Sequence, residues 1–159
     1  MDSLDEAHAR LKLAVKSGSV REIDEAVSNV MLHRDPESIK HLLFALSDET
    51  EYDEGMFSIL NAAESFDDRT YTDELIPILP RLREAAPRWA SIAFIRLVNN
   101  SNTRQLLLSS IPNNSSAVRE SIAWLCNKIS ERKASFLEKT TPILTAISTS
   151  ERLGRPRNY

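Results

Sequence analysis

Three acidic residues, Glu64, Asp67 and Asp68, stand close enough in the sequence to suggest acid/base chemistry. Two carboxylates can serve as general acid and base when both line a cleft that holds the substrate. No glycine-lined cleft is indicated around them, because the chain has only three glycines. Motifs for a serine nucleophile, a phosphate-binding loop or a dinucleotide site are also absent. We therefore expect a protein that is not an enzyme and has no catalytic residues.

Metal and thiol chemistry have equally little support. The histidines His8, His33 and His41 do not form a His-Glu-x-x-His motif, and no Cys/His pairs occur at zinc spacing. The acidic segment 48–55 does not match a calcium-binding loop, because its glycine falls two places late. The single cysteine, Cys126, follows the helical spacing of apolar neighbours, which predicts a small buried residue. We expect no metal and no cofactor.

The elements that must position any site are helices. Capping boxes begin two of them after Ser3 and Ser19, and Gly18 ends the first. The second ends near His33, and Asp35 caps the third. Apolar spacing predicts further helices at about 36–47, 54–66, 73–86, 87–99, 101–110 and 116–131, and a last helical region around Phe136 and Leu137.

Several boundaries rest on proline and polar residues. The segment 67–72 is expected to be a loop, and Pro80 is expected to kink or end the helix over 73–86. Pro142, capped by Thr141, is expected to start a separate short helix over about 142–149. Residues 151–159 read as a frayed basic tail after one domain over 1–150.

The fold class is therefore all-α with about nine helices. Pairs of helices starting near 36, 73 and 102 repeat at steps of roughly 30–37 residues, which favours a HEAT-like stack of antiparallel helix pairs. Because no sharp sequence repeat accompanies these steps, an irregular helical bundle remains the alternative. The helix that begins at Pro87 is apolar on nearly every side and should be the most buried element.

Charge is divided unevenly along the chain. Residues 1–80 hold 18 acidic and 7 basic side chains, whereas residues 81–159 hold 5 acidic and 13 basic ones. Asp48, Glu49, Asp67 and Asp68 are expected at helix C-terminal ends, where negative charge is slightly unfavourable, so a role in binding would explain them. An ordinary solvated face would explain them too.

We expect an acidic binding face whose two parts lie on opposite rims of the stack. The face is made by ten carboxylates with two tyrosines as aromatic anchors: Asp48, Glu49, Glu51, Tyr52, Asp53, Glu54, Glu64, Asp67, Asp68, Tyr71, Asp73 and Glu74. Such a face should attract a basic protein and repel nucleic acid.

The basic half offers a competing interpretation, a nucleic-acid stripe. Its candidates are spread over three helices: Arg81, Arg83, Arg88, Arg96 and Arg104. No exposed aromatic residues are expected among them, because Trp89 and Trp124 fit core positions better. We expect no nucleic-acid partner. With no apolar run long enough to span a membrane and no signal peptide at the N-terminus, we also expect no membrane association and a cytoplasmic location.

Two stretches, EGMFSILNAAESFDD and APRWASIAFIRLVNN, resemble the immunity protein 30 family of bacterial polymorphic-toxin systems. The resemblance covers roughly residues 36–110. It implies a cytoplasmic inhibitor that binds and blocks a cognate toxin domain delivered by contact-dependent or type VI secretion. We expect the protein to be a monomer before binding and to occlude the toxin with its acidic face. The acidic face agrees with a basic toxin, for example a nuclease. A HEAT-like adaptor or scaffold without a toxin partner is the alternative function.

Overall fold

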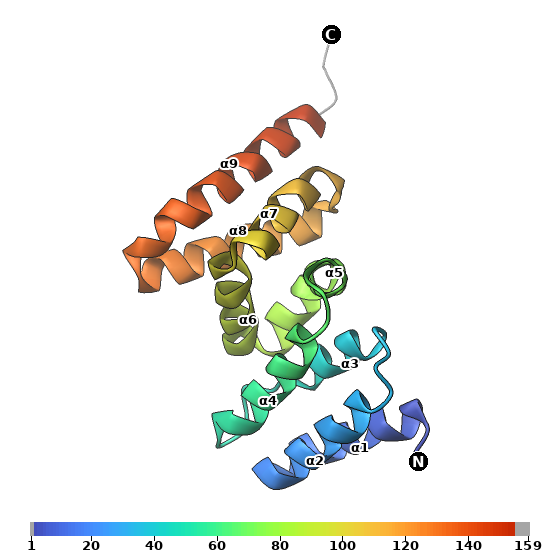
Figure 1. Cartoon of the computed structure of the whole chain (residues 1–159). Helices are drawn as coiled ribbons and strands as arrows, with labels where there is room; N and C mark the ends of the chain where they lie inside the picture. Colours follow the sequence, from blue (N-terminus) through green and yellow to red (C-terminus); the bar gives the residue numbers. More distant parts are fainter. Residues whose placement is uncertain (1, 155–159) are drawn as a thin grey trace.

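The computed structural model describes residues 2–154 and is all-α within that range, with no strand. Nine α-helices follow one another along the chain, with 3₁₀ turns before α8 and α9 (Figure 1). Their bounds are α1 Leu4–Ser17, α2 Val20–Met31, α3 Ser38–Ala45, α4 Asp53–Glu64, α5 Asp68–Ala85, α6 Pro87–Asn99, α7 Ser101–Ser110, α8 Ser116–Arg132 and α9 Leu137–Gly154. The prediction of an all-α fold with about nine helices is confirmed for these residues.

Helices that follow each other in sequence pack as pairs, and the pairs succeed one another along the molecule. The pair α1/α2 lies at one end and α8/α9 at the other, with α5 and α6 between them (Figure 1). Helix α5 contacts α3 on one side and α6, α7 and α8 on the others. It therefore joins the acidic N-terminal half to the basic C-terminal half.

The first two helices begin and end as their sequences predict. The Ser3 side chain accepts a hydrogen bond from the Glu6 N–H, and the Ser19 side chain accepts one from the Glu22 N–H. Gly18 has φ 73°, a left-handed conformation that costs glycine little and ends α1. Helix α3 starts at Ser38 rather than at Pro36, because hydrogen bonds of the i to i+3 kind form its first turn.

Helix α6 is buried along most of its length, as predicted. Trp89 and Phe94 are fully buried large side chains, and Ala90, Ala93 and Val98 are equally shielded from solvent.

The predicted loop at 67–72 is wrong, because α5 already begins at Asp68. The Asp67 side chain accepts hydrogen bonds from the Thr70 N–H and hydroxyl at 2.9 and 2.7 Å, which caps the helix. Pro80 does not end the helix either, since α5 continues through Pro77 and Pro80 to Ala85. Pro77 is exposed, so the carbonyl it leaves unpaired can be satisfied by water.

The separate short helix expected at 142–149 is also wrong. Helix α9 runs without interruption from Leu137 to Gly154 and includes Pro142 near its start. Pro142 is exposed and sits in the second turn, where the freed carbonyl lies near the helix N-terminus. Of the basic tail predicted at 151–159, the first four residues are helical, and residues 155–159 lie outside the described part of the chain.

Candidate functional site

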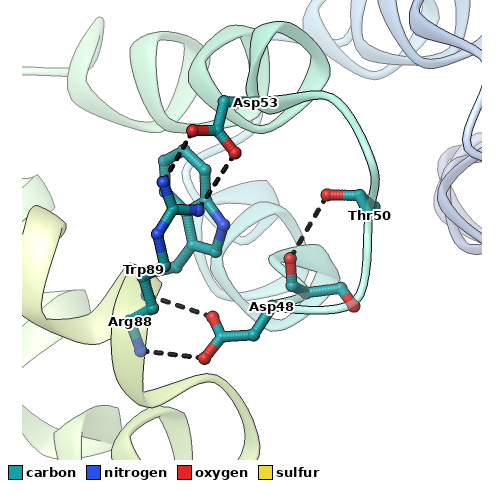
Figure 2. A network of polar contacts seen from close by, with 6 residues as sticks. Asp48, Thr50, Asp53, Arg88 and Trp89 are labelled. Atoms are coloured by element: carbon teal, nitrogen blue, oxygen red, sulfur yellow. Dashed lines mark hydrogen bonds and ion pairs between the residues drawn. The ribbon is translucent and has the colours of Figure 1, made fainter.

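The loop between α3 and α4 is fastened to the N-terminus of α6 by one carboxylate. Asp48 accepts hydrogen bonds from the backbone N–H groups of Arg88 and Trp89, at 2.9 and 3.2 Å (Figure 2). Ala86, at the N-cap position of α6, has no side chain that can cap the helix. Asp48 therefore supplies the missing cap from another part of the chain, and its negative charge lies at the favourable end of the helix dipole.

A second contact ties α4 to α6. The Arg88 guanidinium donates to both oxygens of Asp53, at 3.0 and 2.6 Å, in the bidentate geometry of a strong ion pair (Figure 2). The hydrogen bond from Arg88 lowers the pKa of Asp53, and the same contact raises the pKa of Arg88. Because both side chains remain substantially exposed, the pair fixes geometry more than it adds stability.

Two aromatic side chains are exposed beside these contacts. Tyr52 is 53% exposed at the N-cap position of α4, where it was predicted to serve as an anchor. Phe57 is 37% exposed, and its ring meets the buried Trp89 ring edge to face, with centroids 4.9 Å apart. Exposed aromatic residues on an ordered loop are common anchors of protein interfaces.

Three carboxylates near Tyr52 point to solvent without a counter-charge. Glu49, Glu51 and Glu54 are exposed, and none forms an ion pair with another side chain of residues 2–154. We call Glu49, Glu51, Tyr52 and Glu54 the acidic loop. Its charge is uncompensated, whereas the charges of Asp48 and Asp53 are used within the protein.

The far end of α4 differs from the prediction, because its acidic residues have structural partners. Glu64 forms an ion pair with Arg96 at 2.6 Å, and the Asp68 carboxylate accepts a hydrogen bond from the Asn102 amide at 2.7 Å. Asp67 lies at the N-terminus of α5 rather than at a C-terminal end, and hydrogen bonds from Thr70 lower its pKa. Helix stability accounts for Asp67 without any binding role.

The prediction of Tyr71 as an exposed anchor is wrong. Tyr71 is only 4% exposed, because the early start of α5 places it in the first turn of a helix, on the core side. Burial raises the pKa of its phenol, and the nearby Glu64 raises it further. On the neighbouring turn, Glu74 lies 3.5 Å from Lys40, and Asp73 is exposed.

The three carboxylates considered for acid/base chemistry do not form a cluster in the structure. Glu64, Asp67 and Asp68 bind three different partners on separate elements, so they do not share a cleft. No group of three or more His, Cys, Asp or Glu residues within 2–154 could hold a metal ion. Cys126 is fully buried, and burial raises the pKa of its thiol to about 12.

A groove that sequence reasoning missed lies next to the acidic loop. It has a volume of about 590 Å³ and is formed by the start of α6, Asp48 of the α3–α4 loop and one face of α8. Its lining residues are Asp48, Pro87, Arg88, Ser91, Trp124, Lys128, Glu131 and Arg132. The sequence signal was the spacing of Trp124, Lys128 and Arg132, which four-residue steps place on one face of a helix.

The prediction that Trp124 is a core residue is only partly right, because the side chain packs against the core but its ring also lines the groove. One helix neighbour and one residue of α5 bring positive charge to this ring. The Arg83 guanidinium lies 4.6 Å from the ring centroid and the Lys128 ammonium 5.8 Å from it, both within the range of cation–π attraction. Trp89, in contrast, is fully buried as predicted.

The arginines proposed as a nucleic-acid stripe are largely engaged inside the protein. Arg88 and Arg96 bind carboxylates, Arg104 donates to the Val98 carbonyl, and Arg81 lies over the Phe44 ring. These contacts leave no continuous row of free cations among them.

Fold and surface together define a helical protein whose distinctive exposed features are an acidic loop and a groove, rather than a catalytic cleft. Among the described residues, no helix combines the length and apolar character needed to cross a membrane. A family model described as Immunity protein 30 matches residues 10–107, which is more than half of the chain. The chain belongs to the immunity protein 30 family, whose members are non-enzymatic toxin inhibitors.

The matched residues contain the acidic loop, the Asp48 cap and the start of α6. They also include α2 and most of α1, so the match extends further toward the N-terminus than the resemblance over 36–110. Comparisons with curated proteins and with solved structures gave no match.

Proposed function

We propose that this protein acts in the cytoplasm as an immunity protein, which binds one cognate toxin domain and blocks it. The family match over residues 10–107 carries this proposal, because inhibition of a toxin is the function that unites the family. In this proposal the protein is a monomer before binding, and the toxin domain arrives from a neighbouring cell by contact-dependent or type VI secretion.

We assign the toxin contact to the acidic loop. Its support is that Glu49, Glu51 and Glu54 are exposed and carry uncompensated charge, with the exposed Tyr52 among them. An uncompensated acidic surface accelerates association with a basic partner and disfavours acidic ones. A basic toxin, such as a nuclease with a phosphate-binding surface, fits this surface best.

The remaining residues of the predicted face have supporting or peripheral places in this proposal. Asp48 and Asp53 hold the loop against α6 through their contacts with the start of that helix. A loop held in one conformation before binding loses less conformational entropy when the toxin docks. Asp73 and Glu74 lie within α5 rather than on the α3–α4 loop, and Glu74 pairs with Lys40 of α3.

Co-expression tests the function. The protein would be expressed together with the C-terminal domain of the protein encoded immediately upstream, in cells that this domain alone kills. Rescue of growth, with a complex that co-purifies, is the expected result. Continued killing despite good expression of folded protein would contradict the toxin proposal and favour the adaptor.

A matched pair of variants tests the surface. Glu49→Lys with Glu51→Lys reverses two charges of the acidic loop, and Asp24→Lys with Glu120→Lys reverses two exposed acidic charges elsewhere. We expect the loop variant to weaken toxin binding by about 10- to 100-fold, mainly at low salt, and the control by less than about threefold. Equal affinities of the two variants would contradict the choice of surface and leave the function standing.

A further inference from the structure

The groove beside the acidic loop carries free positive charge, whereas the loop carries negative charge. Lys128 and Arg132 project from α8, and neither forms an ion pair with any carboxylate in the described part of the chain. Trp124 lies on the same helix, and the Arg83 guanidinium, which does not itself line the groove, lies over its ring and forms no ion pair among residues 2–154. Arg83 and Lys128 lie against the indole of Trp124, and Arg132 lines the same groove, so apolar surface is available beside positive charge.

Two carboxylates also line the groove: Asp48 is hydrogen-bonded within the protein, and Glu131 is not paired with a cation. Asp48 is occupied by the two backbone N–H groups of α6, and Arg88 is occupied by Asp53. Glu131 is exposed and without an ion pair among residues 2–154. The lining charges without a partner among residues 2–154 are therefore two cations, Lys128 and Arg132, against one anion, Glu131, and Arg83 adds a positive charge over Trp124.

The groove and the acidic loop are parts of one surface. Asp48 lines the groove and also begins the segment that carries Glu49, Glu51 and Tyr52. A partner that covers the acidic loop can therefore reach the groove without any movement of the protein. The α8 wall lies outside residues 10–107, so the family match by itself does not supply this part of the surface.

From this arrangement we propose that the groove binds an acidic segment of the partner protein, with a carboxylate at Lys128 and Arg132 and its carbon chain on Trp124. Charge complementarity selects this occupant, because the free cations favour carboxylates and Trp124 offers the apolar contact that a peptide side chain needs. A nucleic acid fits less well, since its continuous row of phosphates would extend past Lys128 and Arg132 onto Glu131 and the acidic loop, whereas a single carboxylate side chain need reach only the two cations. The part of the proposal that identifies the partner as the toxin rests on the proposed function, and the toxin would then meet two adjoining surfaces of opposite charge.

A peptide measurement tests the groove without a toxin. The full-length protein would be titrated into a short fluorescein-labelled polyglutamate peptide, and anisotropy would be followed at low and at physiological salt. Polylysine of the same length and an oligothymidylate serve as the other probes. We expect saturable binding of polyglutamate that Trp124→Ala and Lys128→Gln with Arg132→Gln each weaken by about tenfold or more.

Two further variants make this result specific. Glu131→Gln removes the groove carboxylate that forms no ion pair, and it should tighten polyglutamate binding by about two- to threefold. Lys12→Gln with Arg152→Gln removes two exposed cations far from the groove and should leave binding unchanged within about twofold. Circular dichroism of each variant separates lost binding from lost folding.

A second arm uses the toxin domain identified by co-expression. Lys128→Gln with Arg132→Gln should weaken toxin binding by about tenfold, independently of the effect of Glu49→Lys with Glu51→Lys. Unchanged toxin affinity in the groove variant would overturn the two-surface proposal while the immunity function stands. If no toxin binds, the proposed function fails, and the peptide arm still decides whether the groove recognises acidic segments.

Three results of the peptide arm would overturn the inference. The first is no saturable binding of polyglutamate to the unmodified protein. The second is tighter, Trp124-dependent binding of oligothymidylate, which would assign the groove to nucleic acid. The third is self-association in sedimentation experiments that Lys128→Gln with Arg132→Gln abolishes, which would assign it to a second copy of this chain.

Discussion

Replacing Asp48 with alanine should destabilise the protein through a helix that lies 39 residues away in sequence. The substitution removes both hydrogen bonds to the first turn of α6 and the negative charge at that end of the helix. Loss of a helix cap costs about 0.5–2 kcal/mol. Because two N–H groups lose a charged acceptor at once, and Asp48 is partly buried, we expect about 2 kcal/mol.

Chemical denaturation followed by circular dichroism measures this loss as a change in the free energy of unfolding. For a chain of this length, about 2 kcal/mol corresponds to a decrease in Tm of about 4–8 °C. Glu49→Ala is the matched control, because Glu49 is the next residue, is exposed and should change stability by less than about 0.5 kcal/mol. Asp48→Asn should fall between the two, since an amide can still accept a hydrogen bond but carries no charge.

Hydrogen exchange gives a local readout of the same contact. In Asp48→Ala the amides of Arg88 and Trp89 should exchange faster than in Glu49→Ala, because they lose their acceptors. If Asp48→Ala and Glu49→Ala were equally stable, with equal protection of these two amides, Asp48 would not be the cap of α6. The argument that it holds the acidic loop in place would then fail as well.

Two further predictions concern the parts of the molecule on either side of this contact. His8 is buried, stacks on His41 at 3.8 Å and meets the Ser38 hydroxyl at 3.1 Å, and burial followed by the charge of His41 lowers its pKa. The unfolded chain therefore binds a proton more readily than the folded one, so stability should be full above the ordinary histidine pKa of about 6.5 and fall as the pH is lowered through that value. Denaturation between pH 7.5 and pH 5 checks this against His8→Gln, and an unchanged pH slope in that variant would argue against His8 as the source. Asp67→Ala should cost about 1 kcal/mol because it removes the cap of α5, whereas Asp73→Ala, an exposed residue six positions later, should cost less than about 0.5 kcal/mol. Equal stability of these two variants would return Asp67 to the list of candidate binding residues.

The excess of acidic residues in the N-terminal half predicted one acidic binding face, but the structure does not leave all of these carboxylates free. Many of the carboxylates predicted to bind a partner instead meet cations or amide groups from the basic half, as Asp53 meets Arg88 and Glu64 meets Arg96. Ion pairs between segments far apart in sequence depend on how the helices pack, so composition alone overestimates the free charge. Tyr52 is exposed, as an anchor must be, and its contact with a toxin stays a prediction.

The sequence by itself determined the all-α class, most of the helices and the buried character of α6. Apolar residues at helical spacing and local caps such as Ser3, Ser19 and Gly18 act within a few residues, so they can be read without knowledge of the fold. The sequence also carried the similarity that places the chain in its family. That stacked pairs of this kind form a HEAT-like repeat in the strict sense stays a prediction.

Only the tertiary structure decided which polar residues are free to bind a partner. Asp48 became a cap because α6 packs beside its loop, Tyr71 became buried because Asp67 starts α5 early, and Trp124 came to line a groove because α8 faces the start of α6. For Asp48 and Trp124 the neighbouring group belongs to another helix. For Tyr71 the cause is a helix start that the sequence pattern placed several residues too late. Long-range packing, rather than local propensity, therefore set the chemistry of the surface.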